Sequence, residues 1–279
     1  MKYLITGSKG QVGSSVKEKV DEAVGLDRYN SDIEQDISDQ EVIAKIEEEG
    51  PDVIVHCAAI TDLDYVENNP KEARRVNVKG TENIVEAAKN VDAHLIFIST
   101  DNVFGGNKGD YTEMDELNPS NIYAETKVKA EKRVSELEKH TIMRTSVVFK
   151  ENFSNFFEWA RTKLKNEGEL EVIDDQIVNP TYASNLAEFI KEASEKNIFG
   201  TFNVAGASKV SRYEAVQIMK QELDVDGDIK REKMKNLDWI AERPKNSSLS
   251  LQKSGRAFET PLLTLSEAFQ NFEVNSGED

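Results

Sequence analysis

The chain has little of several residue types, and each shortage excludes a class of protein. Cys57 is the only cysteine among 279 residues, so an internal disulfide is excluded. The three histidines, His56, His94 and His140, are scattered singly, and we predict no metal site. No apolar run approaches the roughly 18 residues of a membrane span, and the start, MKYLITG, lacks the apolar core of a signal peptide. We therefore expect a cytoplasmic protein.

Basic residues are also in the minority. The sequence has 35 Lys and Arg against 52 Asp and Glu, a formal charge of −17, which argues against nucleic acid and against an anionic membrane as partners. Prolines number only six, and the composition, 38% hydrophobic and 31% charged, is typical of a globular protein. A chain of this length can form one large domain or two small ones.

Short apolar runs alternate with helical patterns in the first half of the chain. The runs are KYLIT, AVGLD, DVIVHCAA, HLIFIST and HTIMRTSVVF, and amphipathic segments such as QVGSSVKEKV separate them. Continuous apolar strands joined by helices indicate a parallel sheet that is covered on both faces. The predicted fold class is therefore α/β, a doubly wound (Rossmann) parallel sheet, with ligands binding at the carboxyl ends of its strands.

The pattern becomes less regular after about Val148. We expect residues 1–148 to form a dinucleotide-binding domain and residues 149–279 to form a smaller, mostly C-terminal substrate-binding lobe. The segment YASNLAEFIKEASEK, residues 182–196, predicts a helix that packs back on the first domain.

A glycine-rich turn follows the first predicted strand. In GSKGQVG, Gly7, Gly10 and Gly13 precede a helix, and such a turn lets the backbone approach a pyrophosphate held at the helix N-terminus. Asp27 follows the second strand, where an acidic residue binds the adenosine ribose and favours NAD. The adjacent Arg28 could instead pair with the additional phosphate of NADP. The sequence thus predicts NADPH or NADH and leaves the choice open.

Three side chains can converge over a nicotinamide. Tyr123 and Lys127 lie four residues apart in YAETK, on one face of a predicted helix, and Thr100 ends the strand HLIFIST at the ligand edge. YAETK alone fits one turn of an ordinary helix equally well. Read with the glycine turn and the strand-end hydroxyl, it predicts a proton donor for the reduction of a carbonyl group.

Motifs along nearly the whole chain carry a resemblance to a known family. They are GSKGQVG, DVIVHCAAITDLDYVE, VNVKGTENIVEAA, ISTDNVF, YAETK, MRTSVVF, DDQIVNPTYASNLAE, GTFNVAG and RPKNSSL. With them the chain resembles the extended short-chain dehydrogenases/reductases, and most closely the dTDP-4-dehydrorhamnose reductase family. The resemblance implies NAD(P)H-dependent reduction of the 4-keto group of a nucleotide-activated deoxysugar, with dTDP-4-dehydrorhamnose as the expected substrate. It also makes a homodimer an expectation.

The resemblance assigns roles to single residues. Tyr123 would donate its phenolic proton, Lys127 would hold the nicotinamide ribose and lower the tyrosine pKa, and Thr100 would bind the carbonyl oxygen. Asn77 would support the active-site loop, and Arg243 would reach the nucleotide diphosphate. The implied cofactor-binding residues are Gly7, Gly10, Gln11, Val12, Gly13, Asp27, Arg28, Asp36, Ile37, Ala58, Ala59, Thr61, Asn77, Tyr123 and Lys127, and the implied substrate-binding residues are Thr100, Asp101, Asn102, Val147 and Arg243.

Three positions depart from the family pattern. Asn102 stands where the family usually has Tyr, Val147 where it has Trp, and Val178 where it commonly has Gly. The position of Val147 lies against the sugar in the resembling enzymes, so the identity of the sugar stays open. A 4,6-dehydratase is disfavoured, because it needs an Asp and Glu pair where this chain has Asp101 and Asn102. Another sugar-nucleotide ketoreductase, a 4-epimerase, and a non-catalytic subunit similar to the regulatory subunit of methionine adenosyltransferase stay open as alternatives.

Overall fold

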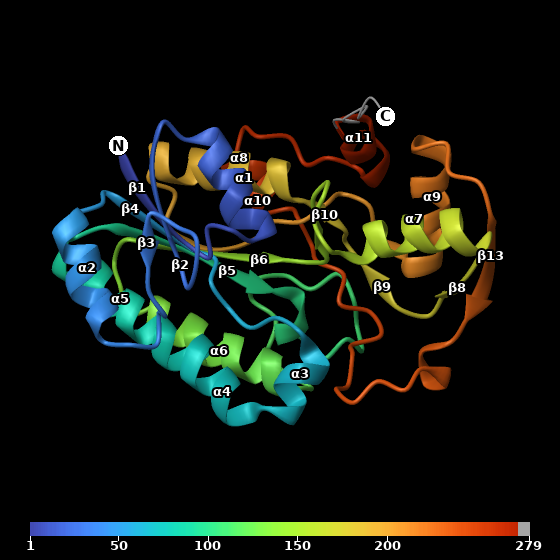
Figure 1. Cartoon of the computed structure of the whole chain (residues 1–279), viewed down its shortest axis with the longest axis horizontal. Coiled ribbons are helices and arrows are strands. Elements are labelled where there is room, and N and C mark those ends of the chain that lie inside the picture. The colour runs from blue at the N-terminus through green and yellow to red at the C-terminus, as the bar shows by residue number, and fades with distance from the viewer. Residues whose placement is uncertain (273–279) are drawn as a thin grey trace.

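A seven-stranded parallel sheet forms the centre of the computed structural model, which describes residues 1–272 (Figure 1). The strand order is β11-β6-β5-β4-β1-β2-β3, so the order reverses between β1 and β4. Ligands bind at such a switch point in open α/β sheets. The predicted doubly wound parallel sheet is confirmed. Its strands are β1 (Lys2–Thr6), β2 (Glu22–Asp27), β3 (Ile33–Glu34), β4 (Val53–His56), β5 (His94–Thr100), β6 (His140–Thr145) and β11 (Gly200–Asn203).

Helices cover both faces of this sheet (Figure 1). Leu4 and Leu95 are buried on the face under α2, α5 and α6, whereas Ile5 and Ile96 are buried on the face under α1 and α8. Successive side chains of a strand point to opposite faces, which is why strands covered twice are continuously apolar. The helices of this region are α1 (Gln11–Lys19), α2 (Glu41–Glu49), α3 (Leu63–Asn68), α4 (Pro70–Arg74), a π-helical turn (Arg75–Gly80), α5 (Thr81–Asn90), a 3-10 turn (Asp101–Val103), α6 (Ile122–Val134) and α8 (Ala183–Glu195).

The segment HTIMRTSVVF does not form one continuous strand, contrary to the prediction. β6 ends at Thr145, and β7 (Val148–Phe149) pairs with β10 (Thr181–Tyr182) outside the central sheet. Between them Val147 has a φ of 44°, in the left-handed region that β-branched residues rarely adopt. This residue turns the chain out of the sheet and toward the smaller lobe.

The smaller lobe has a core of its own, formed by side chains such as Phe157, Leu164, Val216 and Phe269. β8 and β13 form a parallel ribbon against α7 and α9 at one end of the molecule (Figure 1). The elements of this lobe are α7 (Phe156–Glu167), β8 (Glu169–Ile173), β9 (Ile177–Val178), β12 (Val210–Ser211), α9 (Arg212–Glu222), β13 (Asp228–Glu232), a 3-10 turn (Met234–Asn236) and α11 (Leu265–Gln270). The short helix α10 (Ser254–Ala257) lies instead beside α1 and α8 (Figure 1).

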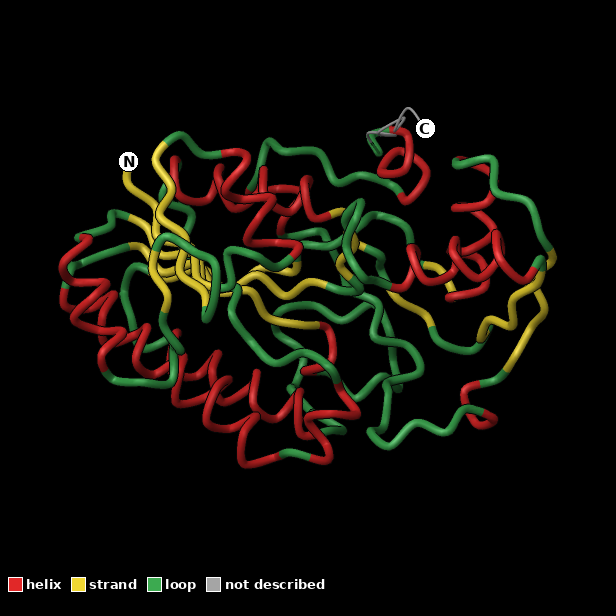
Figure 2. The backbone as a smooth tube through the Cα atoms, viewed as in Figure 1, coloured by secondary structure: helices red, strands yellow, loops and turns green. Residues whose placement is uncertain are grey.

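The chain beyond residue 148 also returns to the central sheet. α8, which spans most of the predicted helix 182–196, packs against α1, and β11 pairs with β6 as the edge strand. The domain division at residue 148 stays a prediction, and residues 273–279 of the predicted lobe lie outside the described residues. Loops fill the junction between the sheet and the smaller lobe (Figure 2), which is where the carboxyl ends of the strands lead.

Candidate functional site

Two adjoining cavities lie at the carboxyl ends of the strands. The first, about 620 Å³ and here called the sheet-edge cavity, extends from the glycine turn to α6. The second, about 570 Å³ and here called the lobe cavity, extends into the smaller lobe. The residues that line both are Leu63, Asp101, Asn102, Val147 and Arg212. Of the predicted cofactor-binding residues, the following line the sheet-edge cavity: Gly7, Gly10, Gln11, Val12, Gly13, Asp27, Arg28, Asp36, Ile37, Ala58, Ala59, Thr61, Tyr123 and Lys127.

The glycine turn forms one end of the sheet-edge cavity. Gly7 has a φ of 66°, and a Cβ atom there would lie 2.8 Å from the Ala58 nitrogen, so a larger residue does not fit. A Cβ atom on Gly13 would lie 2.2 Å from the Gly7 carbonyl oxygen. The first N–H groups of α1 have no helical partner and carry the positive end of the helix dipole. This end of the cavity therefore fits the pyrophosphate of a dinucleotide.

Asp27 and Arg28 lie where β2 ends beside this turn. The Asp27 carboxylate accepts the backbone N–H groups of Lys9, at 3.1 Å, and of Arg28, at 2.8 Å. The Arg28 guanidinium makes no ion pair within residues 1–272 and lines the cavity. The acid is thus tied to the glycine turn, whereas the cation is available to a phosphate.

Asp36 and Ile37 form the wall beyond Arg28. Asp36 accepts the Ser38 backbone N–H at 2.9 Å and forms an ion pair with Arg75 at 3.2 Å. Burial acts to raise the pKa of Asp36, but the hydrogen bonds from Ser38 and the charge of Arg75 lower it below its ordinary value. Ile37 is 4% exposed and packs under α5, so this wall offers an apolar surface beside a fixed carboxylate.

Asn77 is the one predicted cofactor-binding residue that does not line either cavity. It is 2% exposed, and its side-chain amide accepts the Ile60 N–H at 2.8 Å and donates to the Ile60 carbonyl at 3.0 Å. It also donates to the Thr126 hydroxyl at 3.1 Å. These bonds fix the loop after β4 to α6, so Asn77 supports the cavity wall from behind, and its cofactor-binding role stays a prediction.

Thr100, Tyr123 and Lys127 meet in the sheet-edge cavity. Thr100 is the last residue of β5, while Tyr123 and Lys127 lie one turn apart on α6. The side chain of Asn121 caps this helix by accepting the Ala124 N–H at 2.8 Å. Burial raises the pKa of Tyr123, a side-chain hydrogen bond with Thr100 opposes the rise, and the charge of the neighbouring Asp101 adds to it.

Lys127 is buried against β5. Its ammonium donates to the Ile98 carbonyl at 2.7 Å and lies 3.9 Å from the centre of the Phe97 ring. Burial lowers the pKa of Lys127 to about 7, and the charge of Glu131 opposes this fall. The ammonium is directed to a backbone carbonyl and burial raises the tyrosine pKa, so the expected lowering of the Tyr123 pKa by Lys127 stays a prediction.

Asp101 links the end of β5 to the C-terminal part of the chain. It is 2% exposed, and its carboxylate accepts the hydroxyls of Ser247 at 2.5 Å and Ser146 at 2.7 Å. Thr100 and the Asn102 side chain complete its partners. Ser247 belongs to RPKNSSL, a motif noted in the sequence without a role for this serine. Its contact with Asp101 places that segment next to Thr100.

The lobe cavity has aromatic walls and two arginines. The aromatic rings are those of Phe156, Trp159 and Trp239. Arg243, which was predicted to bind the substrate, lines the cavity. Its guanidinium, however, forms a double ion pair with Asp64, at 2.6 and 2.9 Å. Arg212 lines both cavities and was not predicted. The only signal for it in the sequence is a basic residue directly after Ser211, which caps α9.

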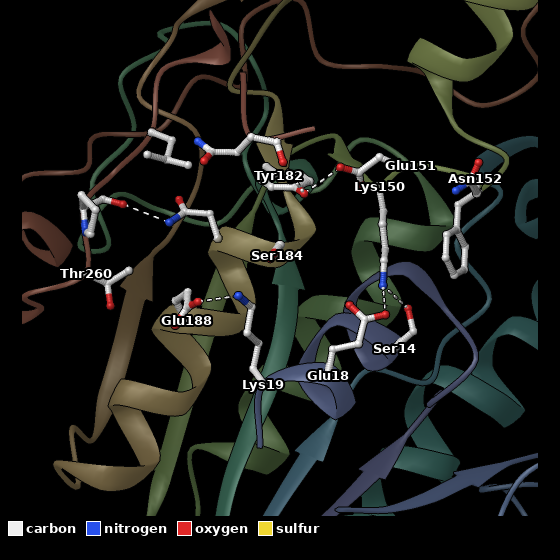
Figure 3. Close-up of a pocket in the computed structure, with 15 residues that line it drawn as sticks. Ser14, Glu18, Lys19, Lys150, Glu151, Asn152, Tyr182, Ser184, Glu188 and Thr260 are labelled. Atoms are coloured by element: carbon white, nitrogen blue, oxygen red, sulfur yellow. Dashed lines mark hydrogen bonds and ion pairs between the residues drawn. The ribbon is translucent and has the colours of Figure 1, made fainter. Parts of the chain in front are cut away.

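A third hollow lies on the outer side of α1 and has a different character (Figure 3). Its volume, about 850 Å³, exceeds that of either cavity at the sheet edge. Its charged side chains pair with each other, Lys19 with Glu188 at 2.7 Å and Lys150 with Glu18 at 2.6 Å. It contains none of the predicted site residues, so size alone does not mark the site of chemistry.

Comparisons with known proteins place the chain in a family. A family model described as RmlD substrate binding domain matches residues 1–275. The dTDP-4-dehydrorhamnose reductase of Aggregatibacter actinomycetemcomitans is 33% identical over 276 residues, covering 92% of this chain and 93% of that protein. The chain belongs to the dTDP-4-dehydrorhamnose reductase family.

Solved structures of dTDP-4-dehydrorhamnose reductases have the same fold over their whole length. That of Bacillus anthracis, in complex with NADP, has a TM-score of 0.92 at 28% identity, covering 98% of this chain and 99% of that chain. That of Clostridium acetobutylicum has a TM-score of 0.91 at 29% identity, covering 98% of both chains. In this member of the dTDP-4-dehydrorhamnose reductase family, no helix within residues 1–272 is long and apolar enough to cross a membrane.

Proposed function

We propose that this chain reduces the 4-keto group of dTDP-4-dehydrorhamnose with NADPH. The observation that carries the proposal is the meeting of Thr100, Tyr123 and Lys127 at the edge of a dinucleotide-sized cavity in a chain of this reductase family. The substrate is that of the related reductases, and the cofactor is supported by the NADP complex of the Bacillus anthracis relative.

The residues of the sheet-edge cavity fit a nicotinamide dinucleotide from end to end. The N-terminus of α1 would hold the pyrophosphate, and Arg28 and Ile37 would flank the adenosine. Lys127 would hold the nicotinamide ribose, which places the ring against the end of β5. When bound there, the cofactor supplies the hydride.

The protein supplies the proton and the electrostatic stabilisation. Reduction of a ketone adds one hydride to the carbon and one proton to the oxygen. The Thr100 hydroxyl would exchange its hydrogen bond to Asp101 for one to the carbonyl oxygen and stabilise the negative charge that develops there. Tyr123, beside Thr100, would then pass its phenolic proton to that oxygen. A tyrosine whose pKa is raised by burial is protonated at neutral pH, as a proton donor must be.

The smaller lobe would hold the nucleotide and the sugar. Aromatic side chains such as Trp239 can stack on a base, and Val147, at the junction of the two cavities, would face the sugar. The catalytic set favours a reductase over a non-catalytic cofactor-binding subunit, because cofactor binding alone does not need a proton donor. The homodimer and the cytoplasmic location stay expectations from the sequence.

The proposal is tested by mixing the purified chain with NADPH and dTDP-4-dehydrorhamnose and following the loss of NADPH absorbance. We expect one NADPH to be oxidised for each dTDP-rhamnose formed. A 4-epimerase would convert the sugar without net oxidation of NADPH, and a binding subunit would bind NADPH without converting the sugar. Either of those results would overturn the proposal.

A further inference from the structure

Arg212 is the first residue of α9 and lies at the boundary between the two cavities. Its Nε atom donates to the Gln176 side-chain oxygen at 3.1 Å, and its guanidinium carbon lies 4.6 Å from the centre of the Phe156 ring. These two contacts hold the plane of the guanidinium. Its two Nη groups make no hydrogen bond or ion pair within the described part of the chain, so they can bind a ligand.

Arg243, the other cation that lines the lobe cavity, is already satisfied. Its Nη1 and Nη2 atoms bind the two carboxylate oxygens of Asp64, and Nη1 also donates to the Ala241 carbonyl at 2.6 Å. Its guanidinium carbon lies 4.4 Å from the centre of the Trp239 ring. Arg243 therefore fixes the segment around Ala241 against α3, and binding a ligand would require it to give up these partners.

The nearest buried carboxylate does not neutralise Arg212 by contact. Asp101 attracts Arg212 electrostatically, but no ion pair joins them, and hydroxyls of Ser146 and Ser247 occupy the carboxylate. Burial lowers the pKa of Arg212 to about 10, and the charge of Asp101 opposes this fall. The guanidinium is therefore positively charged at neutral pH, partly shielded from water and unpaired, which are the properties of a receptor for an anion.

We propose that Arg212 binds the diphosphate of the nucleotide-sugar substrate through its two Nη groups, an inference that rests on the proposed function. A guanidinium binds phosphate oxygens in a bidentate manner and is the preferred side chain for this task. The position also fits the order of groups in the substrate. Arg212 lies between Thr100, at which the sugar ketone would react, and Trp239, on which the base can stack.

The cofactor's own pyrophosphate does not compete for this arginine. The N-terminus of α1 provides a separate anion site at the glycine turn, and Arg212 lines the other end of the sheet-edge cavity, with Asp101 and Val147. The diphosphate of a second ligand that extends into the lobe cavity is therefore the anion that fits this position.

The test compares dTDP binding by the wild-type chain, Arg212→Gln, Arg212→Lys and Arg256→Gln in calorimetric titrations, each with saturating NADPH. Arg256 is exposed and lies outside both cavities, so its variant controls for the loss of one positive charge. We expect Arg212→Gln to raise the Kd for dTDP by about 10- to 150-fold, as for the loss of charge-assisted hydrogen bonds. Arg212→Lys should lie between that value and the wild type, because lysine keeps the charge without the bidentate geometry.

Two further measurements complete the test. NADPH binding shows whether a variant is folded, and turnover tests the proposed function. NADPH should bind with the same Kd in all four proteins, which shows that the variants fold. If NADPH binding is kept and Arg212→Gln binds dTDP as tightly as the wild type, or if the wild type binds no dTDP, the inference fails. Turnover of dTDP-4-dehydrorhamnose by the wild type judges the proposed function separately. An arginine-dependent dTDP site in a chain without turnover would support the inference and overturn the function.

Discussion

Arg144 on β6 and Glu131 on α6 form a buried ion pair, with 2.7 Å between Arg144 Nη2 and Glu131 Oε2 and both side chains 6% exposed. Glu131 also accepts the Ser99 hydroxyl at 2.5 Å. It lies one helical turn beyond Lys127, whose pKa its charge raises. The pair therefore holds α6 against the sheet. It thereby fixes the position of Tyr123 and Lys127, which lie on the same helix, relative to the cavity.

Removing the acid of this pair should destabilise the whole domain. Glu131→Ala leaves the Arg144 charge buried and unpaired, and we expect the free energy of unfolding to fall by about 3–5 kcal/mol. Urea denaturation measures this difference. The matched control is Glu136→Ala on the exposed pair with Arg133, for which we expect a change within about 1 kcal/mol. If the free energy of unfolding falls equally in the two variants, the buried pair contributes no more to stability than the exposed pair does, and the prediction is wrong.

The phenol of Tyr123 should be required for turnover and not for cofactor binding. Tyr123→Phe keeps the ring and removes the proton, so we expect kcat to fall by about 100- to 10,000-fold with an unchanged Kd for NADPH. Steady-state kinetics and a fluorescence titration with NADPH measure the two quantities. Tyr29→Phe, at a position that is 71% exposed, is the control for loss of a hydroxyl. Full turnover in Tyr123→Phe would remove this residue from the mechanism.

Arg28 should make the chain prefer NADPH to NADH. Its guanidinium makes no ion pair within residues 1–272, whereas the Asp27 carboxylate is bound to backbone N–H groups. For Arg28→Ala we expect the ratio of kcat/KM values, NADPH over NADH, to fall by about 10- to 150-fold through loss of a charge-assisted contact. Arg133→Ala, an exposed position on α6, should leave the ratio unchanged. A wild-type preference for NADH would mean that Asp27 decides the choice.

His56 should make stability depend on pH. Its ring nitrogens lie 2.7 Å from the Thr6 hydroxyl and 3.0 Å from the Thr81 hydroxyl, and burial lowers its pKa from 6.5 to about 3. Between these pH values the unfolded chain binds a proton that the folded chain does not. The free energy of unfolding therefore falls as the pH falls, by at most about 1.4 kcal/mol per pH unit from this group.

A variant without the titrating ring isolates this contribution. His56→Gln cannot be protonated in this range, so the stability of the wild type relative to the variant should decline as the pH is lowered from 6.5 to 4.5. Urea denaturation at several pH values measures the difference. Parallel stability curves for the two proteins would contradict the prediction.

The features that sequence predicted well are those determined by neighbouring residues. The apolar runs gave the buried strands, the glycine spacing gave the turn before α1, and Tyr123 and Lys127 share a face because they lie four apart on one helix. Thr100 could be placed with them because parallel strands bring their carboxyl ends to one edge. The motif resemblance then gave the family, which the comparisons confirmed.

The features that were missed depend on contacts between distant segments. The bond between Arg212 and Gln176 spans 36 residues, and the one between Arg243 and Asp64 spans 179, so neither cation could be assigned as free or paired from its neighbours in the sequence. The left-handed conformation of Val147 was also hidden, because valine in an apolar run predicts an uninterrupted strand. The missed features therefore concentrate at the substrate side of the site.

The most direct test of the central claim is to follow the hydride itself. The chain is given dTDP-4-dehydrorhamnose and NADPH that carries deuterium at the transferable position of the nicotinamide, and the product is examined by mass spectrometry and NMR. We predict dTDP-rhamnose with one deuterium, bound to C4 of the sugar. A product with hydrogen from solvent at C4, or an unconverted sugar in the presence of bound cofactor, would contradict the account.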